Sequence, residues 1–192
     1  MSEELQLKIE EFLLKNGSKG KVSELVPLTG GASAETWSFT FSSKNKSERM
    51  ILRRGSGKKS PLAVLKSEEA IIQQKVKSSG APVPTIVAIS SGDKDLGDAY
   101  LMGLIPGESI ARKILRDKKF SAARQKLAFQ CGEALAKIHS VNLNDFDQVP
   151  KKPIREELKR LYLTYKSFEQ PLPVFEYAFK WLDKQDFTTR KD

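Results

Sequence analysis

The chain has 192 residues, with 33 Lys and Arg against 24 Asp and Glu, one His and one Cys. This length is ample for a hydrophobic core without disulfides or metals as supports, and a single Cys excludes an internal disulfide. No apolar stretch approaches the roughly 20 residues that cross a bilayer, and the acidic start at Met1–Glu4 does not resemble a signal peptide. We therefore expect a reduced, cytoplasmic protein that does not enter a membrane.

The net charge of +9 has a possible functional meaning, because basic proteins bind nucleic acids and phosphorylated ligands. The lysines occur as scattered pairs in turn-like segments, without a dense arginine stripe or interleaved aromatic residues. This distribution favours an ordinary solvated surface. An anionic small ligand remains open, and dedicated nucleic-acid binding is disfavoured.

Hydrophobic periodicity predicts a sheet-rich first part. Apolar residues at helical spacing predict a helix over Glu3–Lys15 and another over Ala63–Lys77. Strand-like runs lie between turn-rich segments at Val22–Thr29, Ala34–Phe41, Arg49–Arg53, Thr85–Ile89 and Ala99–Leu104. The short connections between the first three runs predict an antiparallel meander.

Past Pro106-Gly107 the pattern is helical only, so the fold class is α+β with a lobe boundary between residues 105 and 106. Helices are expected at Glu108–Leu115, Ser121–Ser140, from near Pro153 onward, and at Val174–Lys184. The second of these carries Leu127, Cys131, Ala134, Leu135 and Ile138 on one face. We expect that face to be buried and Cys131 to be a core residue rather than a nucleophile.

The short motifs of common sites fail. Gly57-Lys58-Lys59-Ser60 lacks the Ser or Thr that follows Gly-Lys in a phosphate-binding Walker loop. No zinc or calcium pattern occurs, so no metal site built from this chain alone is expected. His139 lies near the end of the long predicted helix and is best explained as a helix C-terminal residue.

Two neighbouring features could bind phosphates. The pattern of Leu28–Trp37 predicts a strand, a glycine turn and a returning strand. This segment is either an ordinary hairpin or a loop whose free backbone N–H groups lie over a bound ligand. Met50–Arg54 is a strand that turns basic at its end, and Glu68 and Glu69 begin the helix that follows it. The helix dipole alone explains acids there, but an Arg–Glu ion pair would also aim a cation at a nucleotide.

Taken together, the segments resemble the aminoglycoside phosphotransferase family of kinase-like small-molecule phosphotransferases. The resemblance is greatest to bacterial members similar to the kinase domain fused to some acyl-CoA dehydrogenases. It runs in family order from about Leu25 to Leu182, through Leu28–Trp37, Ile51–Arg54, Glu68–Ile72, Gly80–Pro84, Tyr100–Met102, Pro106–Ile110 and Ala134–His139.

The resemblance implies a protein-kinase-like fold that binds ATP. Residues 1–105 would form the nucleotide-binding lobe with its leading helix, and residues 106–192 part of the helical C-lobe. Arg53 stands where kinases carry a phosphate-binding Lys, with Glu68 as its partner and Glu69 as the alternative. Further nucleotide contacts are implied for the covering loop and for the connector between lobes: Gly30, Gly31, Ser33, Leu101, Met102, Gly103 and Leu104. Met102 by itself would also suit a core strand.

One part of the family pattern is missing. The His-Gly-Asp-x-x-x-x-Asn loop and the later magnesium-binding Asp do not occur in the sequence. We therefore expect an N-terminal fragment or truncated form of a phosphotransferase acting on a small-molecule hydroxyl group, inactive alone, with Mg²⁺ bound only by the full-length form. The alternative is a non-catalytic, pseudokinase-like nucleotide- or partner-binding protein. Were magnesium to bind strongly here, Asp145, Asp147 and Asp186 would be the first residues to consider.

Overall fold

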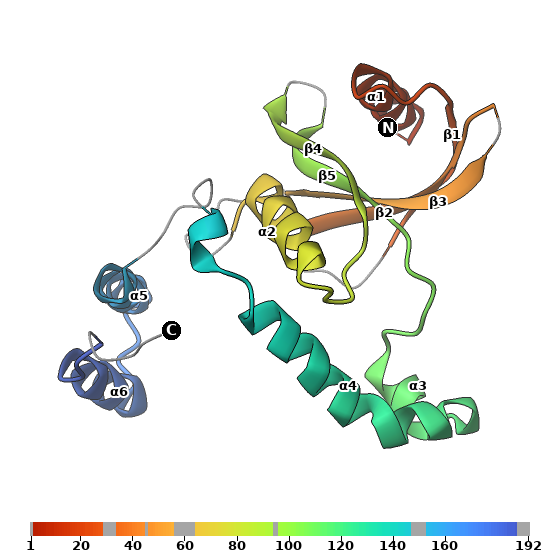
Figure 1. The fold of residues 1–192 in the computed structure, drawn as a ribbon. Helices are drawn as coiled ribbons and strands as arrows, with labels where there is room; N and C mark the ends of the chain where they lie inside the picture. The colour runs from red at the N-terminus through yellow and green to blue at the C-terminus, as the bar shows by residue number, and fades with distance from the viewer. Residues whose placement is uncertain are drawn as a thin grey trace. The chain divides into compact units, whose positions relative to one another are not determined.

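The computed structural model describes residues 2–28, 34–44, 46–55, 64–93, 96–146 and 153–187. Contacts divide the chain into two compact units, residues 1–149 and residues 150–192 (Figure 1). These units are defined by packing, whereas the expected boundary near residue 105 separates functional lobes and stays a prediction. Within the described ranges, no helix is both long and apolar enough to cross a membrane.

A single five-stranded antiparallel sheet organises the first unit, which confirms the α+β class. Its strands, in the order β1-β2-β3-β5-β4, are β1 Lys21–Pro27, β2 Ala34–Ser42, β3 Ser47–Gly55, β5 Gly97–Gly103 and β4 Ile86–Asp93. The predicted meander is confirmed in β1, β2 and β3. After β3 the chain passes through helix α2 (Lys66–Ser78) and β4, and β5 then returns to pair with β3 on one side and β4 on the other.

One face of the sheet packs against α1 (Ser2–Lys15) and forms the hydrophobic core. The helix is fixed to β1 by polar contacts as well: Glu10 Oε1 accepts the Val22 N–H at 2.8 Å, and Gln6 Nε2 donates to the Val22 carbonyl at 2.7 Å. The core cluster contains Leu5, Ile9, Phe12, Leu13, Val22, Phe39, Phe41, Met50, Leu52, Ala88, Leu96, Ala99 and Leu101.

The opposite face of the sheet carries α2. Successive side chains of a strand point to opposite faces, so Arg53 and Tyr100 lie on the face away from Leu52 and Leu101. Arg53 and Tyr100 are register partners on β3 and β5. A cationic and a phenolic side chain are therefore presented together to α2.

The remaining helices follow the connector after β5. The first unit continues with α3 (Ala111–Arg116), a 3₁₀ turn at Lys118–Phe120, α4 (Ser121–His139) and a second 3₁₀ turn at Leu143–Phe146. The second unit holds α5 (Ile154–Ser167) and α6 (Pro173–Asp183), which pack through aromatic rings. Tyr162 and Phe179 meet edge to face, with ring centroids 5.1 Å apart.

The expectation of a buried α4 face is wrong. Leu127, Leu135 and Ile138 are exposed, as is Cys131, which is a free thiol. Periodicity identified the face correctly, but it carries no information on whether another element covers that face. His139 does lie in the last turn of α4, as predicted.

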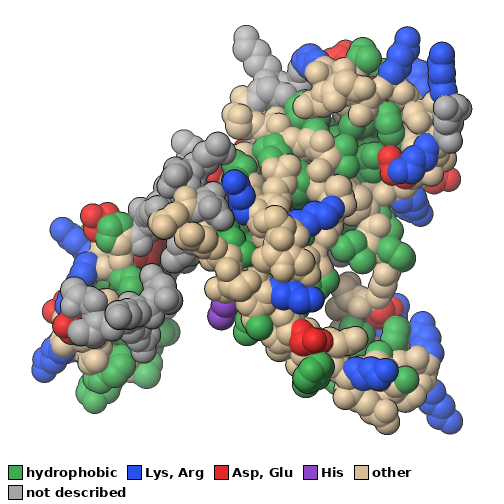
Figure 2. Space-filling model, in the orientation of Figure 1, with side chains coloured by type: hydrophobic (Ala, Val, Ile, Leu, Met, Phe, Trp, Pro, Cys, Tyr) green, Lys and Arg blue, Asp and Glu red, His purple; other side chains and the backbone are tan. Residues whose placement is uncertain are grey.

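Lys and Arg side chains are scattered over the face of the molecule shown in Figure 2, without gathering into one basic patch there. This distribution agrees with the solvated surface that the sequence favours.

Candidate functional site

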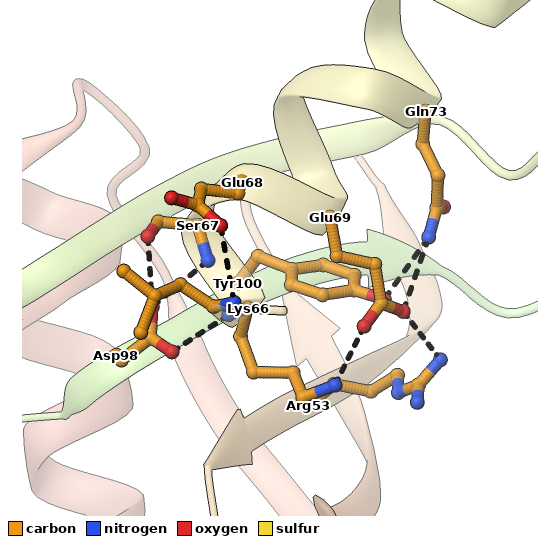
Figure 3. Close-up of polar contacts among 9 residues, drawn as sticks. Arg53, Lys66, Ser67, Glu68, Glu69, Gln73, Asp98 and Tyr100 are labelled. Atoms are coloured by element: carbon orange, nitrogen blue, oxygen red, sulfur yellow. Dashed lines mark hydrogen bonds and ion pairs between the residues drawn. The ribbon is translucent and has the colours of Figure 1, made fainter. Parts of the chain in front are cut away.

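Arg53 lies at the centre of the sheet, where its backbone pairs with Thr36 of β2 and Tyr100 of β5. Its side chain is 29% exposed, and Nη1 lies 2.9 Å from Glu69 Oε1 on α2 (Figure 3). The expected ion pair between strand and helix is therefore present. Its acidic partner is Glu69, the alternative, and the expectation for Glu68 is wrong.

Glu68 is turned away by its place in the first helical turn. The sequence predicts a helix from Ala63, but α2 begins at Lys66, which makes Glu68 the third helical residue. A Glu at this position reaches back to the start of its helix, and Glu68 Oε2 accepts the Leu65 N–H at 3.3 Å. Glu69, one residue later, faces the sheet.

Glu69 is the hub of a polar cluster (Figure 3). Lys66 Nζ lies 2.6 Å from Oε2, and the Tyr100 hydroxyl donates to Oε1 at 2.8 Å. Gln73 Nε2 donates to the Tyr100 hydroxyl at 3.1 Å and lies 3.5 Å from Oε1. The Lys66 side chain is only 10% exposed, a degree of burial that lysine reaches almost solely when paired.

The cluster changes the acidity of two of its members. Burial raises the pKa of Glu69, but the hydrogen bonds from Lys66 and Tyr100 and the charge of Arg53 together lower it below the ordinary 4.5. Burial, and then the hydrogen bond to Glu69, raise the pKa of Tyr100 to about 12. Glu69 is therefore ionised and Tyr100 protonated at neutral pH, which is the state that the contacts require.

Acid should weaken the fold through Glu69. Because its folded pKa lies below its unfolded value of 4.5, its contribution to stability is present above pH 4.5 and is lost as the pH falls through the folded pKa. We expect the difference in free energy of unfolding between wild type and Glu69→Gln, measured in urea, to shrink from pH 6 to pH 3. A constant difference over this range would contradict the lowered pKa.

A second carboxylate anchors the start of α2. Asp98, at the beginning of β5, accepts the Lys66 N–H at 2.6 Å and the Ser67 N–H at 2.9 Å. It also accepts the Ser67 hydroxyl at 2.8 Å (Figure 3). The first two amides of a helix have no partner within it, so Asp98 supplies the cap from a neighbouring strand.

The expected connector residues lie along the same strand pair. Met102 pairs with Ile51 and Gly103 with Met50, so both lie opposite residues that precede Arg53 on β3. The N–H of Gly103 donates to Thr85 at 2.9 Å and that of Leu104 to Arg49 at 3.1 Å. These two amides are thus engaged by the sheet. The Leu101 side chain is buried in the core on the α1 face, and the role of these four residues toward adenine stays a prediction.

The other predicted contacts lie outside the described residues: Gly30, Gly31 and Ser33. Sequence reasoning missed Lys66, Gln73, Tyr100 and Asp98 as members of the cluster. A usable signal existed for Tyr100, because residues two apart on a strand share a face and Asp98, Tyr100 and Met102 are so spaced. In the described part of the chain, no group of three or more His, Cys, Asp or Glu residues is placed to hold a metal ion.

Comparison with known proteins gives an independent identification. The model of the phosphotransferase enzyme family, APH, matches residues 24–187, which includes every strand of β2 to β5, α2 and the helices that follow. A comparison with curated proteins found no match. The matched residues include Arg53 and Glu69, which form the ion pair between β3 and α2. Since the match covers most of the chain, the chain belongs to the phosphotransferase enzyme family.

Proposed function

We propose that this chain provides the nucleotide-binding half of an ATP-dependent phosphotransferase that acts on a hydroxyl group of a small molecule. The observation that carries the proposal is the Arg53–Glu69 ion pair, 2.9 Å long, on the face of the sheet that carries α2. A cation held in place by a carboxylate can bind phosphate oxygens with little loss of side-chain freedom. Glu69 would orient Arg53, and Arg53 would bind the phosphates.

The sheet register supports this assignment. Gly103 is opposite Met50, three residues before Arg53 on β3, so the connector and the cation are separated by roughly 10 Å along the strand. This separation suits a nucleotide lying along β3 with its base at the connector and its phosphates at Arg53. Arg keeps the positive charge of the usual Lys and adds bidentate geometry toward phosphate.

Phosphoryl transfer needs more than this cluster supplies. An acceptor hydroxyl must be positioned by an Asp, and Mg²⁺ must neutralise the phosphates. Because the sequence has no His-Gly-Asp segment, we infer that these groups come from outside the 192 residues and that this chain alone does not turn over. The competing proposal is a pseudokinase-like protein that binds a nucleotide or a partner without catalysis.

Calorimetric titration of ATP, with and without Mg²⁺, tests the binding role of Arg53. We expect weak binding that Arg53→Ala reduces by about tenfold, the loss of one charge-assisted contact. Arg54→Ala is the matched control, because Arg54 is the next residue, points to the opposite face and pairs with Glu35 at 2.6 Å. Equal losses in the two variants would reject Arg53 as a specific phosphate ligand.

A coupled ADP-release assay separates the two proposals. We expect no turnover by the 192-residue chain on hydroxy acids, hydroxyacyl thioesters, amino alcohols or aminoglycosides. A longer chain, read from the DNA that follows the codon for Asp192 and containing His-Gly-Asp, should release ADP with one of these classes. A longer chain that binds ATP and stays inactive would favour the pseudokinase; turnover by the short chain that is lost in Arg53→Ala would refute the inference that catalytic groups lie elsewhere.

A further inference from the structure

We propose that Asp98 is a positioning residue: by anchoring the start of α2 to β5, it holds Glu69 against Arg53 and so sets the direction of the phosphate-binding cation. The inference rests on the proposed function, since it concerns how that function's cation is aimed. It adds a residue that belongs to neither side of the ion pair.

The contacts of Asp98 are directed at the helix backbone. Its two carboxylate oxygens accept three hydrogen bonds of 2.6 to 2.9 Å, two from backbone amides and one from the Ser67 hydroxyl. Ser67 and Lys66 are themselves buried. Since backbone amides cannot rotate away as a side chain can, the anchor fixes the helix itself and not merely one side chain.

Glu69 lies close to the anchored residues on the same helix. Lys66 is the first residue of α2, so Glu69 lies one turn further along, on the same side as Lys66. Tyr100, two residues after Asp98 on β5, donates to Glu69 at 2.8 Å. β5 thus holds α2 at two points: Asp98 binds the first amides of the helix, and Tyr100 binds Glu69. Two points of attachment are needed to prevent rotation of the helix on the sheet.

Charge explains why the anchor must be acidic. Arg53 and Lys66 both pair with Glu69, and a single carboxylate leaves one positive charge of the three groups uncompensated. Asp98 restores neutrality, yet its oxygens are occupied by amides and a hydroxyl, so it does not compete with Glu69 for Arg53. Asp98 therefore holds the start of α2 while Arg53 and Lys66 both stay paired with Glu69.

Loss of this anchor should act through Glu69. In Asp98→Asn the amide nitrogen would face N–H groups, leaving at least one buried donor without an acceptor. The first turn of α2 would then open more often, and Arg53 would lose its fixed direction. We expect the Kd for ATP to rise about tenfold in Asp98→Asn and about tenfold in Glu69→Gln.

The double variant Asp98→Asn/Glu69→Gln tests the shared route. If Asp98 acts through Glu69, the double variant should bind only about tenfold more weakly than wild type, rather than about a hundredfold. Glu10→Gln is the matched control, because Glu10 also joins a helix to a strand amide, that of Val22, on the other face of the sheet. This control should lower the melting temperature and leave the Kd for ATP unchanged.

Two further readouts need no nucleotide. Amide hydrogen exchange at Lys66 and Ser67 should be at least about tenfold faster in Asp98→Asn. Tyr100, followed by NMR of labelled tyrosine between pH 9 and 11.5, should begin to ionise at lower pH in Asp98→Asn, because its pKa should fall from about 12 toward 10 as Glu69 leaves it. Ser67→Ala, which removes only one of the three bonds, should show both changes in smaller measure.

The results separate the inference from the function on which it rests. Unchanged amide exchange and unchanged Tyr100 ionisation in Asp98→Asn would overturn the positioning role, as would additive losses in the double variant or an equal loss of ATP affinity in Glu10→Gln. Changed exchange and ionisation, in a protein whose wild type binds no ATP, would support the anchor of α2 and reject the proposed nucleotide function alone.

Discussion

Replacing Phe39 by Ala should lower the free energy of unfolding by about 3–5 kcal/mol. Phe39 is fully buried at the middle of β2, in the cluster that joins the sheet to α1. Its removal takes away buried aromatic area and leaves a cavity that neighbouring strands, fixed by their hydrogen bonds, cannot fill.

Urea unfolding at neutral pH measures this loss, with Phe129→Ala as the control. Phe129 lies on α4 and is 72% exposed, so its truncation should change stability by no more than about 0.5 kcal/mol. A small loss at Phe39, similar to that at Phe129, would mean that α1 is not packed on the sheet.

Truncating Glu69 should be the most damaging change in the polar cluster, at about 3 kcal/mol. In Glu69→Ala the cations of Arg53 and Lys66 lose their shared carboxylate, and Lys66 is only 10% exposed. Removing one partner of a shielded ion pair leaves charges without compensation, which costs more than the net benefit of the pair.

Glu4→Ala gives the matched control, because Glu4 also forms an ion pair of 2.7 Å, with Lys8, but is 68% exposed. Its loss should lower the free energy of unfolding far less than Glu69→Ala does in the same urea experiment, because water screens an exposed pair. Comparable losses at the two positions would show that Glu69 is well solvated and that the cluster does not hold α2.

Local patterns predicted most of the fold because the residues that decide it are close in sequence. The alternation in Ala34–Phe41 and the glycine and polar turns around it are sufficient to indicate β2 and its two neighbours. The ion pair was predicted to within one residue. The resemblance favoured Glu68, but Glu68 is the third residue of α2 and accepts the Leu65 N–H, whereas Glu69 faces Arg53.

The rest of the site depends on contacts between distant residues. Asp98 binds the amide of Lys66 across 32 positions in the chain, and nothing local marks an Asp at a strand start as the cap of another helix. Cys131 shows a second property that the sequence pattern did not predict, the burial of a helix face. Its apolar neighbours define a face, but whether that face is covered is a tertiary property that periodicity cannot report.

The strand order has a consequence for the time course of folding. β1, β2 and β3 are joined by connections that are short in sequence and need only local loop closure, whereas β3 meets β5 after the chain has made α2 and β4. The meander can therefore assemble early, and Arg53 acquires Glu69 and Tyr100 only in the closing step. Substitutions at Asp98 or Glu69 should then mainly accelerate unfolding, while substitutions in the meander, such as Phe39→Ala, should slow refolding.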